Sequence, residues 1–289
     1  MKGIILAGGA GTRLYPLTIA VSKQLLPVND KPMIYYPLST LISANIKEVL
    51  IISTPEDIGL YKRLLGNGAR IGIKIDYAIQ AKPEGLAQAF IIGKDFIGND
   101  NVCLILGDNV FYGSGLDAEL QRIKDSVEKN SQAYIFGYKV KDPERYGVAE
   151  FNNKFEILGI EEKPKTPKSN HAIVGLYFYP NNVIDVVKKV KKSNRGELEI
   201  TSLNNLYIQD KSLKIKLLKN NFFWLDTGTH DSINEASLFI KTIENRENIK
   251  IGCIEKTALD RNFISKDDLK KSIEYYGDNE YSQYLKKLS

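Results

Sequence analysis

The stretch Lys2-Gly-Ile-Ile-Leu-Ala-Gly-Gly-Ala-Gly-Thr-Arg13 opens the 289-residue chain and decides its fold. An apolar run of strand length leads directly into a loop that contains Gly8, Gly9 and Gly11. Glycine tolerates positive φ and lets backbone N–H groups approach an anion closely. Arg13 adds a guanidinium fork that matches phosphate oxygens. The stretch predicts a buried strand followed by a phosphate-binding loop, and the alternative is a tight turn that only needs positive φ.

Two well-known phosphate loops do not fit this stretch. The dinucleotide fingerprint would need a third glycine where Leu14 stands, and Pro16 stands where its helix should start. A P-loop would need Gly-Lys-Ser/Thr at its end, which the stretch lacks. Nicotinamide and P-loop chemistry are therefore disfavoured.

Strand and helix patterns alternate over the first 110 residues or so. This alternation predicts a mostly parallel sheet flanked by helices, in an α/β fold. Ligands bind such sheets beyond the carboxyl ends of the strands, so the loops after Ala7, Gln80 and Leu106 should share one mouth. The expected strands are 2–7, 48–53, 74–80 and 102–106, and the expected helices are 32–44 with Pro32 at its first position, about 55–65, and 85–92.

The remainder of the chain mixes both kinds of pattern. Strands are expected at 133–140, 148–151, 157–162, 172–179, 214–218 and 222–226, and helices at 115–130, 181–190, 200–208 and 229–246. We expect a catalytic domain over 1–240, with a nucleotide-binding part at about 1–110 and a sugar-phosphate-binding part at about 133–226. A helical C-terminal region, 241–289, should carry oligomer or effector contacts.

Composition excludes several classes of protein. The 40 Lys and Arg residues against 35 Asp and Glu leave a net charge of +5, and these cations are dispersed rather than gathered into a nucleic-acid-binding stripe. No apolar run reaches the ~18 residues that span a membrane, and the N-terminus does not resemble a signal peptide. The two cysteines, Cys103 and Cys253, form no disulfide framework or zinc pattern, and Cys103 should be buried. A cytoplasmic protein without nucleic-acid or membrane partners is expected.

Carboxylates at strand ends suggest a metal site. Asp108 follows the apolar run 102–106 after Gly107, and Asp226 is the last residue of the expected strand 222–226. Two such carboxylates can hold Mg²⁺, which keeps several waters and also contacts phosphate oxygens. The alternative is that each aspartate caps a turn. Lys23 is a second cation near the glycine loop, although a lysine before an apolar run can equally be a solvated charge.

The motifs along the chain together resemble those of the sugar-1-phosphate nucleotidylyltransferases, and most closely the glucose-1-phosphate thymidylyltransferases. Their order from residue 3 to about 240 makes the resemblance specific, and it weakens past residue 246. The motifs are Gly8-Gly-Ala-Gly-Thr-Arg-Leu14, Ser22-Lys-Gln-Leu-Leu-Pro27, Gln80, Gly85-Leu-Ala-Gln-Ala89, Leu106-Gly-Asp-Asn109, Glu144-Arg-Tyr-Gly-Val148, Glu161-Glu-Lys-Pro164, Gly175-Leu-Tyr-Phe-Tyr179, Arg195-Gly-Glu-Leu-Glu-Ile-Thr201 and Trp224-Leu-Asp-Thr-Gly-Thr229.

This resemblance implies a Rossmann-like nucleotidyltransferase fold and a Mg²⁺-dependent transfer of a thymidylyl group from dTTP to α-D-glucose 1-phosphate. The products would be dTDP-glucose and pyrophosphate, in the first step toward dTDP-L-rhamnose and other dTDP-deoxysugars. It also implies a homotetramer that is inhibited by dTDP-L-rhamnose at a second site between subunits. No general base is required, because a phosphate monoester is largely ionised near neutral pH. His171, in an expected polar loop, and His230, near an expected helix start, have no assigned role.

The resemblance also assigns residues to roles. Arg13, Lys23 and Lys163 would be catalytic, the first two on the departing pyrophosphate and Lys163 on the sugar phosphate. The nucleotide would be held by Gly8, Gly9, Gly11, Thr12, Arg13, Gln24, Gln80, Gly85 and Asp108, with Gln80 at the thymine edge, where an amide offers both donor and acceptor. The sugar phosphate would be held by Tyr146, Gly147, Glu162, Lys163, Val174, Gly175, Arg195 and Trp224. Asp108 and Asp226 would hold Mg²⁺.

Three other functions remain as alternatives. The same chemistry with another nucleotide or sugar, such as UTP or CTP, is the nearest. Some use of UTP is expected, because one buried methyl group discriminates by only about 1–3 kcal/mol. A metal-dependent glycosyltransferase would usually show Asp-x-Asp, where this chain has Asp108-Asn109-Val110. A non-catalytic nucleotide-sugar sensor should lack some of the residues Arg13, Lys23, Asp108 and Asp226, and all four are present.

Overall fold

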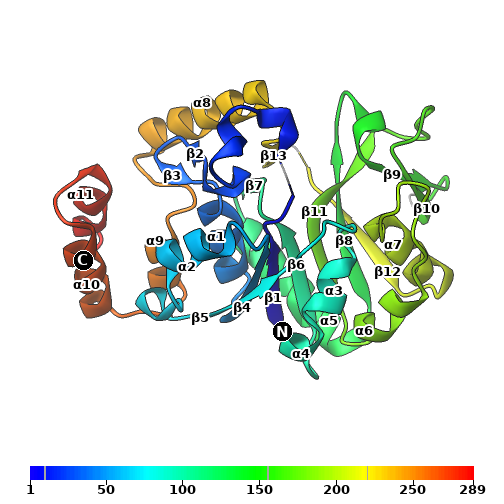
Figure 1. Ribbon diagram of the computed structural model, residues 1–289, viewed down its shortest axis with the longest axis horizontal. Coiled ribbons are helices and arrows are strands. Elements are labelled where there is room, and N and C mark those ends of the chain that lie inside the picture. Colours follow the sequence, from blue (N-terminus) through cyan, green and yellow to red (C-terminus); the bar gives the residue numbers. More distant parts are fainter. Residues whose placement is uncertain (10, 155, 220) are drawn as a thin grey trace.

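The computed structural model describes residues 1–9, 11–154, 156–219 and 221–289. Over these residues the chain forms a central nine-stranded sheet, in the order β10-β9-β11-β6-β1-β4-β5, with β8 pairing β11 and β12 off this path (Figure 1). The strands are β1 (Lys2–Leu6), β4 (Glu48–Ser53), β5 (Lys74–Ile79), β6 (Val102–Leu106), β8 (Ala133–Lys139), β9 (Gly147–Phe151), β10 (Ile157–Glu162), β11 (His171–Tyr179) and β12 (Leu213–Leu217).

The strands β1, β4, β5 and β6 pair in parallel with one another, as the alternating pattern predicts. β1 lies between β4 and β6, and Ile5 is in register with Ile51 and Ile105. Successive side chains of β1 enter different clusters, because Ile5 belongs to one hydrophobic core and Ile4 to another. Both faces of the sheet are therefore covered, which explains why these strands are continuous apolar runs.

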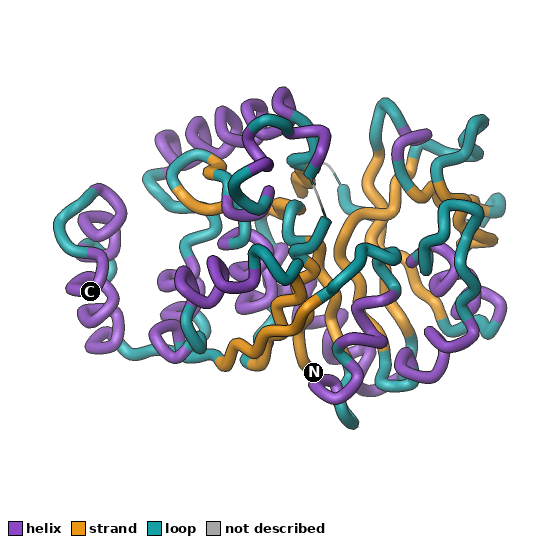
Figure 2. The backbone as a smooth tube through the Cα atoms, in the orientation of Figure 1, coloured by secondary structure: helices purple, strands orange, loops and turns teal. Residues whose placement is uncertain are grey.

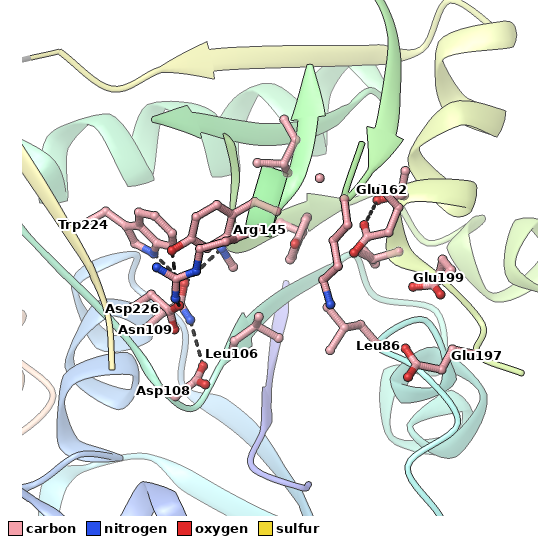
Figure 3. Close-up of a pocket in the computed structure, with 18 of the residues that line it drawn as sticks. Leu86, Leu106, Asp108, Asn109, Arg145, Glu162, Glu197, Glu199, Trp224 and Asp226 are labelled. Atoms are coloured by element: carbon pink, nitrogen blue, oxygen red, sulfur yellow. Dashed lines mark hydrogen bonds and ion pairs between the residues drawn. The ribbon is translucent and has the colours of Figure 1, made fainter. Parts of the chain in front are cut away.

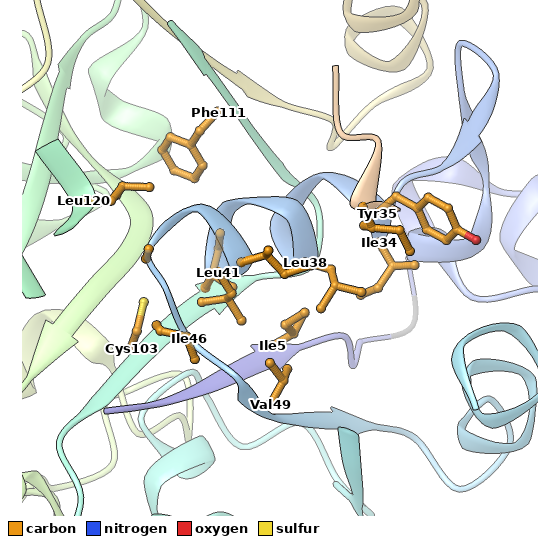
Figure 4. Packing of buried hydrophobic residues seen from close by; sticks show 14 of the residues in the cluster. Ile5, Ile34, Tyr35, Leu38, Leu41, Ile46, Val49, Cys103, Phe111 and Leu120 are labelled. Atoms are coloured by element: carbon orange, nitrogen blue, oxygen red, sulfur yellow. The ribbon is translucent and has the colours of Figure 1, made fainter. Parts of the chain in front are cut away.

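Helices lie on both sides of the band of strands (Figure 2). Figure 4 shows the core beneath α1, where Leu38 and Leu41 lie near Ile5, Val49 and Cys103. The helices of the first 210 residues are α1 (Tyr35–Ser43), α2 (Ile58–Leu65), α3 (Gln88–Ile92), α4 (Lys94–Ile97), α5 (Leu116–Asn130), α6 (Val183–Val186) and α7 (Ile200–Gln209), with short 3-10 turns η1 (Thr12–Leu14), η2 (Leu17–Ile19), η3 (Lys23–Leu25), η4 (Ala69–Ile71), η5 (Pro143–Arg145) and η6 (Val187–Lys189).

Two small antiparallel sheets complete the region around the mouth of the main sheet. β7 (Asn109–Gly113) pairs with β13 (Phe222–Asp226), so that Asp226 lies opposite Asn109. β2 (Pro27–Val28) pairs with β3 (Lys31–Pro32) in a short hairpin. The β7–β13 pairing joins two segments that are far apart in the chain.

Four helices form the C-terminal part: α8 (His230–Glu247), α9 (Ile254–Asp260), α10 (Lys266–Tyr276) and α11 (Glu280–Lys286). Thr229 begins α8 with a capping box that it shares with Ser232. α9 packs against α1, and Leu269 and Leu285 of the last two helices belong to the same core as β1. The proposed division into 1–240 and 241–289 stays a prediction.

Most expected elements are present, and three expectations need correction. Pro32 does not open a helix: it pairs with Pro27 in the hairpin, and α1 begins only at Tyr35. His171 is not in a loop but begins β11, opposite Lys139. The strand β7 was not expected, because it follows β6 after only two residues and its stability depends on pairing with β13. Cys103 is fully buried, as expected.

Within the described ranges, no helix combines the length and the apolar character that crossing a membrane would require.

Candidate active site

A cavity of about 660 Å³ opens at the carboxyl ends of β1 and β6. Its walls come from segments spread over most of the chain, and it collects the majority of the residues that the motifs indicated (Figure 3). The lining residues are Arg13, Leu86, Leu106, Asp108, Asn109, Arg145, Tyr146, Gly147, Glu162, Lys163, Ile173, Gly175, Tyr177, Arg195, Glu197, Glu199, Ile200, Thr201, Trp224 and Asp226.

Two aspartates meet at one side of this cavity. Asp108 lies in the turn between β6 and β7, and its carbonyl accepts hydrogen bonds from the Thr227 backbone N–H (3.3 Å) and Oγ1 (2.8 Å). Thr227 directly follows Asp226, so these bonds hold the two carboxyl-bearing residues together. The pairing of β7 with β13 thus brings together two segments that sequence alone leaves unconnected.

The two carboxyl groups sit in different electrostatic surroundings. Burial alone would raise the pKa of Asp108, but the Lys23 ammonium and its hydrogen bond hold that pKa below the ordinary value. Lys23 Nζ is 2.5 Å from Asp108 Oδ2, and Asn109 Nδ2 donates to Oδ1 at 2.8 Å. Burial and the neighbouring Asp108 charge raise the pKa of Asp226.

Cations and a phenol surround Asp226. Tyr146 donates its hydroxyl to Asp226 Oδ2 at 3.4 Å, and Arg145 Nη2 lies 3.9 Å from the same oxygen. Gly228 leaves space beside this carboxylate, because a Cβ on it would lie 3.2 Å from both Arg13 Nη2 and Asp226 Oδ2. Arg13 therefore reaches the aspartate pair from the glycine loop.

The aspartate pair fits a hard divalent cation. Burial and, second to it, the Asp108 charge raise the pKa of Asp226, and a bound cation would favour the ionised form of both carboxylates. Among the described residues, no group of three or more His, Cys, Asp or Glu side chains is arranged to enclose a metal ion. Mg²⁺ suits two carboxylates because it usually keeps several waters and shares phosphate oxygens.

The opposite side of the cavity carries the Glu162–Lys163 pair at the end of β10. Thr201 Oγ1 donates to Glu162 Oε2 at 2.5 Å. Lys163 has a left-handed backbone (φ +47°), and its N–H donates to the Tyr146 carbonyl at 2.9 Å. A Cβ on Gly147 would lie 3.1 Å from Thr201 Oγ1 and 3.3 Å from Glu162 Oε2. Glycine at 147 therefore keeps this corner of the cavity open.

Arg195 is held by carboxylates at the rim of the cavity. Its Nη2 lies 2.9 Å and 3.0 Å from the two carboxyl oxygens of Glu199, and 3.4 Å from Glu162 Oε1. Two acceptors on Glu199 fix the plane of the guanidinium group. Glu197 Oε2 lies 3.7 Å from the same Nη2, so Arg195 lines the cavity within a cluster of three carboxylates.

Asn109 connects the two sides of the cavity. Its buried Oδ1 accepts from Trp224 Nε1 at 2.6 Å and from the Gly175 N–H at 3.1 Å. Trp224 packs edge to face on Tyr146, with 5.3 Å between ring centroids. Asn109, Arg145 and Thr201 had no expected role, although each lies inside a motif that the sequence displays.

A second hollow, of about 620 Å³, lies beside the first and includes Gly9, Lys23 and Gln80 in its lining. Gln80 Nε2 donates to Gln88 Oε1 at 2.7 Å. Gly8 leaves space for the carbonyl oxygen of the Gln80 side chain, because a Cβ on residue 8 would lie 2.5 Å from Gln80 Oε1. Arg13 and Lys23 thus belong to adjoining hollows that share the glycine loop.

Other expected nucleotide residues occupy the same loop or pack behind it. Gly11 caps the short turn η1, which includes Thr12, and residue 10 of the loop lies outside the described residues. Gln24 is buried, and its Oε1 accepts from Ser22 Oγ at 2.9 Å and from the Tyr61 hydroxyl at 3.2 Å. Gly85 (φ +101°) packs on the backbone of Leu198, where a Cβ would come within 2.4 Å of the carbonyl oxygen.

The expected role of Val174 in the sugar pocket stays a prediction, and it would have to use the backbone of this residue. Its side chain is fully buried in the hydrophobic core. Side chains alternate along a strand, so Ile173, Gly175 and Tyr177 of β11 face the cavity while Val174 faces the other way. The sequence pattern of β11 is apolar on both faces, which hides this alternation.

Comparison with known proteins agrees with this geometry. The family model described as nucleotidyl transferase matches residues 2–243. A glucose-1-phosphate thymidylyltransferase from Neisseria meningitidis is 54% identical over 288 residues, covering 100% of this chain and 99% of its relative. A glucose-1-phosphate thymidylyltransferase from Mycolicibacterium smegmatis is 52% identical, with 100% and 99% covered.

Solved structures share the fold. A crystal structure in complex with sucrose, described as a glucose-1-phosphate thymidylyltransferase from Bacillus anthracis, matches with a TM-score of 0.76 and 41% identity, covering 83% of this chain and 94% of that one. A UDP-glucose pyrophosphorylase solved with UDP-glucose has a TM-score of 0.73 at 23% identity, which concerns the fold alone. Because the family model spans most of the chain and the relatives match it from end to end, the protein belongs to the nucleotidyl transferase family.

Proposed function

We propose that this protein transfers a thymidylyl group from dTTP to α-D-glucose 1-phosphate, with Mg²⁺, and releases dTDP-glucose and pyrophosphate. The observation that carries the proposal is the single cavity that gathers Arg13, Lys163, Asp108 and Asp226 from distant parts of the chain. The names of the full-length relatives support this choice of nucleotide and sugar. Substrates of a sugar-phosphate nucleotidyltransferase are small molecules, which a cavity of this size suits.

In the proposed reaction, an oxygen of glucose 1-phosphate attacks the α-phosphorus of dTTP. The new P–O bond forms opposite the bond to pyrophosphate, which leaves with the bonding electron pair. The attacking phosphate is already an anion near neutral pH, so no side chain needs to remove a proton. The main obstacle is the repulsion between two polyanions, and catalysis consists of positioning and charge stabilisation.

Residues at the two ends of the cavity position different phosphates. Lys163 and Arg195 hold the phosphate of the sugar, and Glu162 accepts hydrogen bonds from sugar hydroxyls. Arg13 and Lys23 hold the β- and γ-phosphates and stabilise the departing pyrophosphate. When bound at Asp108 and Asp226, Mg²⁺ supplies positive charge beside the phosphates.

The nucleotide base fits the hollow that includes Gln80. Its amide faces the imide edge of thymine with one donor and one acceptor. Uracil presents the same edge without the methyl group, so the base alone discriminates weakly. We therefore expect measurable turnover with UTP, although its ribose also carries a 2′-hydroxyl that dTTP lacks. A preference for UTP would favour the second candidate function, formation of UDP-glucose, which the fold of the UDP-glucose pyrophosphorylase structure also accommodates.

The test is pyrophosphate release with dTTP, UTP, CTP, GTP and ATP in turn. Each nucleotide is assayed with and without glucose 1-phosphate and with and without Mg²⁺. We expect the highest kcat/KM with dTTP, dependence on both glucose 1-phosphate and Mg²⁺, and a smaller value with UTP. A preference for GTP or ATP would contradict the thymidylyl assignment.

Further features implied by the resemblance remain predictions. These are a homotetramer, inhibition by dTDP-L-rhamnose at a site between subunits, and a product that enters dTDP-L-rhamnose or another dTDP-deoxysugar. Light scattering measures the oligomeric state, and a titration of the turnover with dTDP-L-rhamnose measures the inhibition.

A further inference from the structure

The carboxylate of Asp108 already carries a cationic partner in this structure. Lys23 Nζ donates to Asp108 Oδ2 at 2.5 Å, and Asn109 Nδ2 donates to Oδ1 at 2.8 Å. Lys23 is only 7% exposed, and it lies on the turn η3 that follows the phosphate loop. The carboxylate, whose side chain is only 22% exposed, is therefore neutralised and hydrogen-bonded at both oxygens.

Asp226 has weaker partners. Arg145 Nη2 lies 3.9 Å from its Oδ2, and the Tyr146 hydroxyl lies 3.4 Å from the same oxygen. The two members of the aspartate pair thus differ in how freely they can accept a cation. A divalent ion that used both carboxylates would share Asp108 with the Lys23 ammonium, and like charges a few ångströms apart repel strongly in a buried site.

A polyphosphate would compete with Asp108 for the ammonium group of Lys23. Lys23 lines the hollow next to the glycine loop, where the proposed function places the phosphates of the nucleotide. The lysine stem is flexible and its ammonium is a point charge, so it can exchange one anion for another without a fixed geometry. A phosphate chain would offer Lys23 an anionic partner other than Asp108.

We propose that Lys23 is the resident counter-ion of Asp108 in the nucleotide-free protein, and that it keeps divalent cations off the aspartate pair until a polyphosphate draws it away. The cation then enters together with the nucleotide rather than before it. The part of the inference that names the polyphosphate rests on the proposed function. The blocking role of Lys23 rests on the ion pair and on the proposal that Asp108 and Asp226 hold the divalent cation.

The test measures binding of Mn²⁺ alone, without nucleotide or sugar, from the electron paramagnetic resonance signal of the free ion. The variant Lys23→Met removes the ammonium, and Lys82→Met removes an exposed lysine next to the residues Ala81 and Pro83 that line the nucleotide hollow. We expect Lys23→Met to bind Mn²⁺ at least about tenfold more tightly than the wild type, and Lys82→Met to behave like the wild type. The double variant Lys23→Met/Asp108→Asn should lose this increase in Mn²⁺ affinity.

Removing Lys23 leaves a half-buried carboxylate without its partner, so Lys23→Met can fail to fold. Lys23→Gln keeps a hydrogen-bond donor and removes only the charge, and the same tenfold gain is expected. Circular dichroism identifies which variants are folded. If folded Lys23→Met or Lys23→Gln binds Mn²⁺ no more tightly than the wild type, the inference is overturned.

A wild-type experiment needs no variant. In crystals of the whole protein grown with Mn²⁺ and no nucleotide, we expect Lys23 on Asp108 and no anomalous peak between the two aspartates. A peak there beside an undisturbed Lys23–Asp108 pair would overturn the inference. Neither experiment contains substrate, so a protein that failed to turn over dTTP could still show that Lys23 blocks the binding of Mn²⁺. Failure of this inference can therefore be distinguished from failure of the proposed function.

Discussion

At the scale of single residues, the charged side chains that line the cavity depend on neighbouring groups that balance or oppose their charge. Asp108 is neutralised by Lys23, Arg195 by Glu199, and Asp226 keeps a raised pKa because burial and Asp108 oppose its ionisation. Each of these groups is positioned before a substrate arrives. Such preorganisation is what allows a side chain to stabilise charge that develops during a reaction.

Lys163→Gln should lower kcat/KM by a factor of about 100 to 1,000, because one preorganised cation beside the reacting phosphate is lost. Pyrophosphate release measured at varied glucose 1-phosphate checks this. Lys165→Gln is the matched control, since this exposed lysine lies two residues away and does not line the cavity as described. Activity of Lys163→Gln within threefold of the control would remove Lys163 from the catalytic group.

Gly147→Ala should raise the KM for glucose 1-phosphate and leave the KM for dTTP unchanged. The new methyl group would lie 3.1 Å from Thr201 Oγ1 and would push it and Glu162 toward the sugar. Gly159→Ala on β10 is the control, because its Cβ would lie 4.0 Å from the nearest atom, Asn205 Oδ1. Steady-state kinetics with each substrate varied in turn makes the comparison. Equal changes in both KM values would argue against a local effect.

At the scale of elements, a network of charges ties the β2–β3 hairpin to α8 and the segment after it. Lys31 lies between Asp30 and Glu244, with 3.0 Å to Glu244 Oε1, and Lys250 also pairs with Asp30. Glu244 accepts the Ile251 N–H at 2.8 Å as well. A short two-stranded hairpin is marginal alone, so these ion pairs and the packing beneath them hold it in place.

Asp30→Asn should lower the thermal midpoint of unfolding at pH 7, and the difference from the wild type should shrink as the pH falls. Burial would raise the pKa of Asp30, but Lys31 and Lys250 hold it below its ordinary value of 3.8. A carboxyl group whose pKa is lower in the folded state stabilises the fold above its unfolded pKa, and this contribution is lost as the pH falls through the folded pKa.

Thermal unfolding monitored by circular dichroism between pH 7 and pH 3 measures this effect. Asp278→Asn is the control, because Asp278 is largely exposed and its contact with Lys286 is screened by water. A destabilisation by Asp30→Asn that stayed constant down to pH 3 would show that charge is not its cause.

At the scale of the whole molecule, the C-terminal helices share a hydrophobic core with the nucleotide half. Leu285 of α11 and Leu269 of α10 belong to the same buried cluster as Ile5 and Leu41. The last two helices lie at the edge of the molecule (Figure 1), and they join the core through the contacts of α10 with α9 and η4. These helices and the sheet should unfold together.

Leu285→Ala should destabilise the entire protein by about 2–5 kcal/mol, in one cooperative transition. Chemical denaturation followed by circular dichroism measures this value. Leu238→Ala is the control, because Leu238 is 67% exposed and its truncation should cost little. A separate early transition in Leu285→Ala, with the main transition unchanged, would mean that the C-terminal helices fold independently.

Local patterns made much of the fold predictable. The parallel strands of the first half follow from apolar runs between turn signals, and the loop of Gly8, Gly9 and Gly11 is encoded by residues that tolerate positive φ. Pro32 and β7 were misjudged because their conformations depend on partners elsewhere: Pro32 pairs with Pro27, and β7 pairs with β13. The orientation of the Val174 side chain, which faces the core, was not predictable, because an all-apolar strand does not indicate which face meets the cavity.

The sequence by itself determined the family, most of the order of the elements and the motifs that contribute to the cavity, because motifs of glycine, lysine and aspartate reflect local backbone and charge requirements. Only the tertiary structure decided that Asp108 meets Asp226, that Lys23 neutralises Asp108 and that Asn109 joins Trp224 to β11. These contacts join residues far apart in the chain. Their formation depends on the pairing of distant strands and on the burial of charge, which no local pattern encodes.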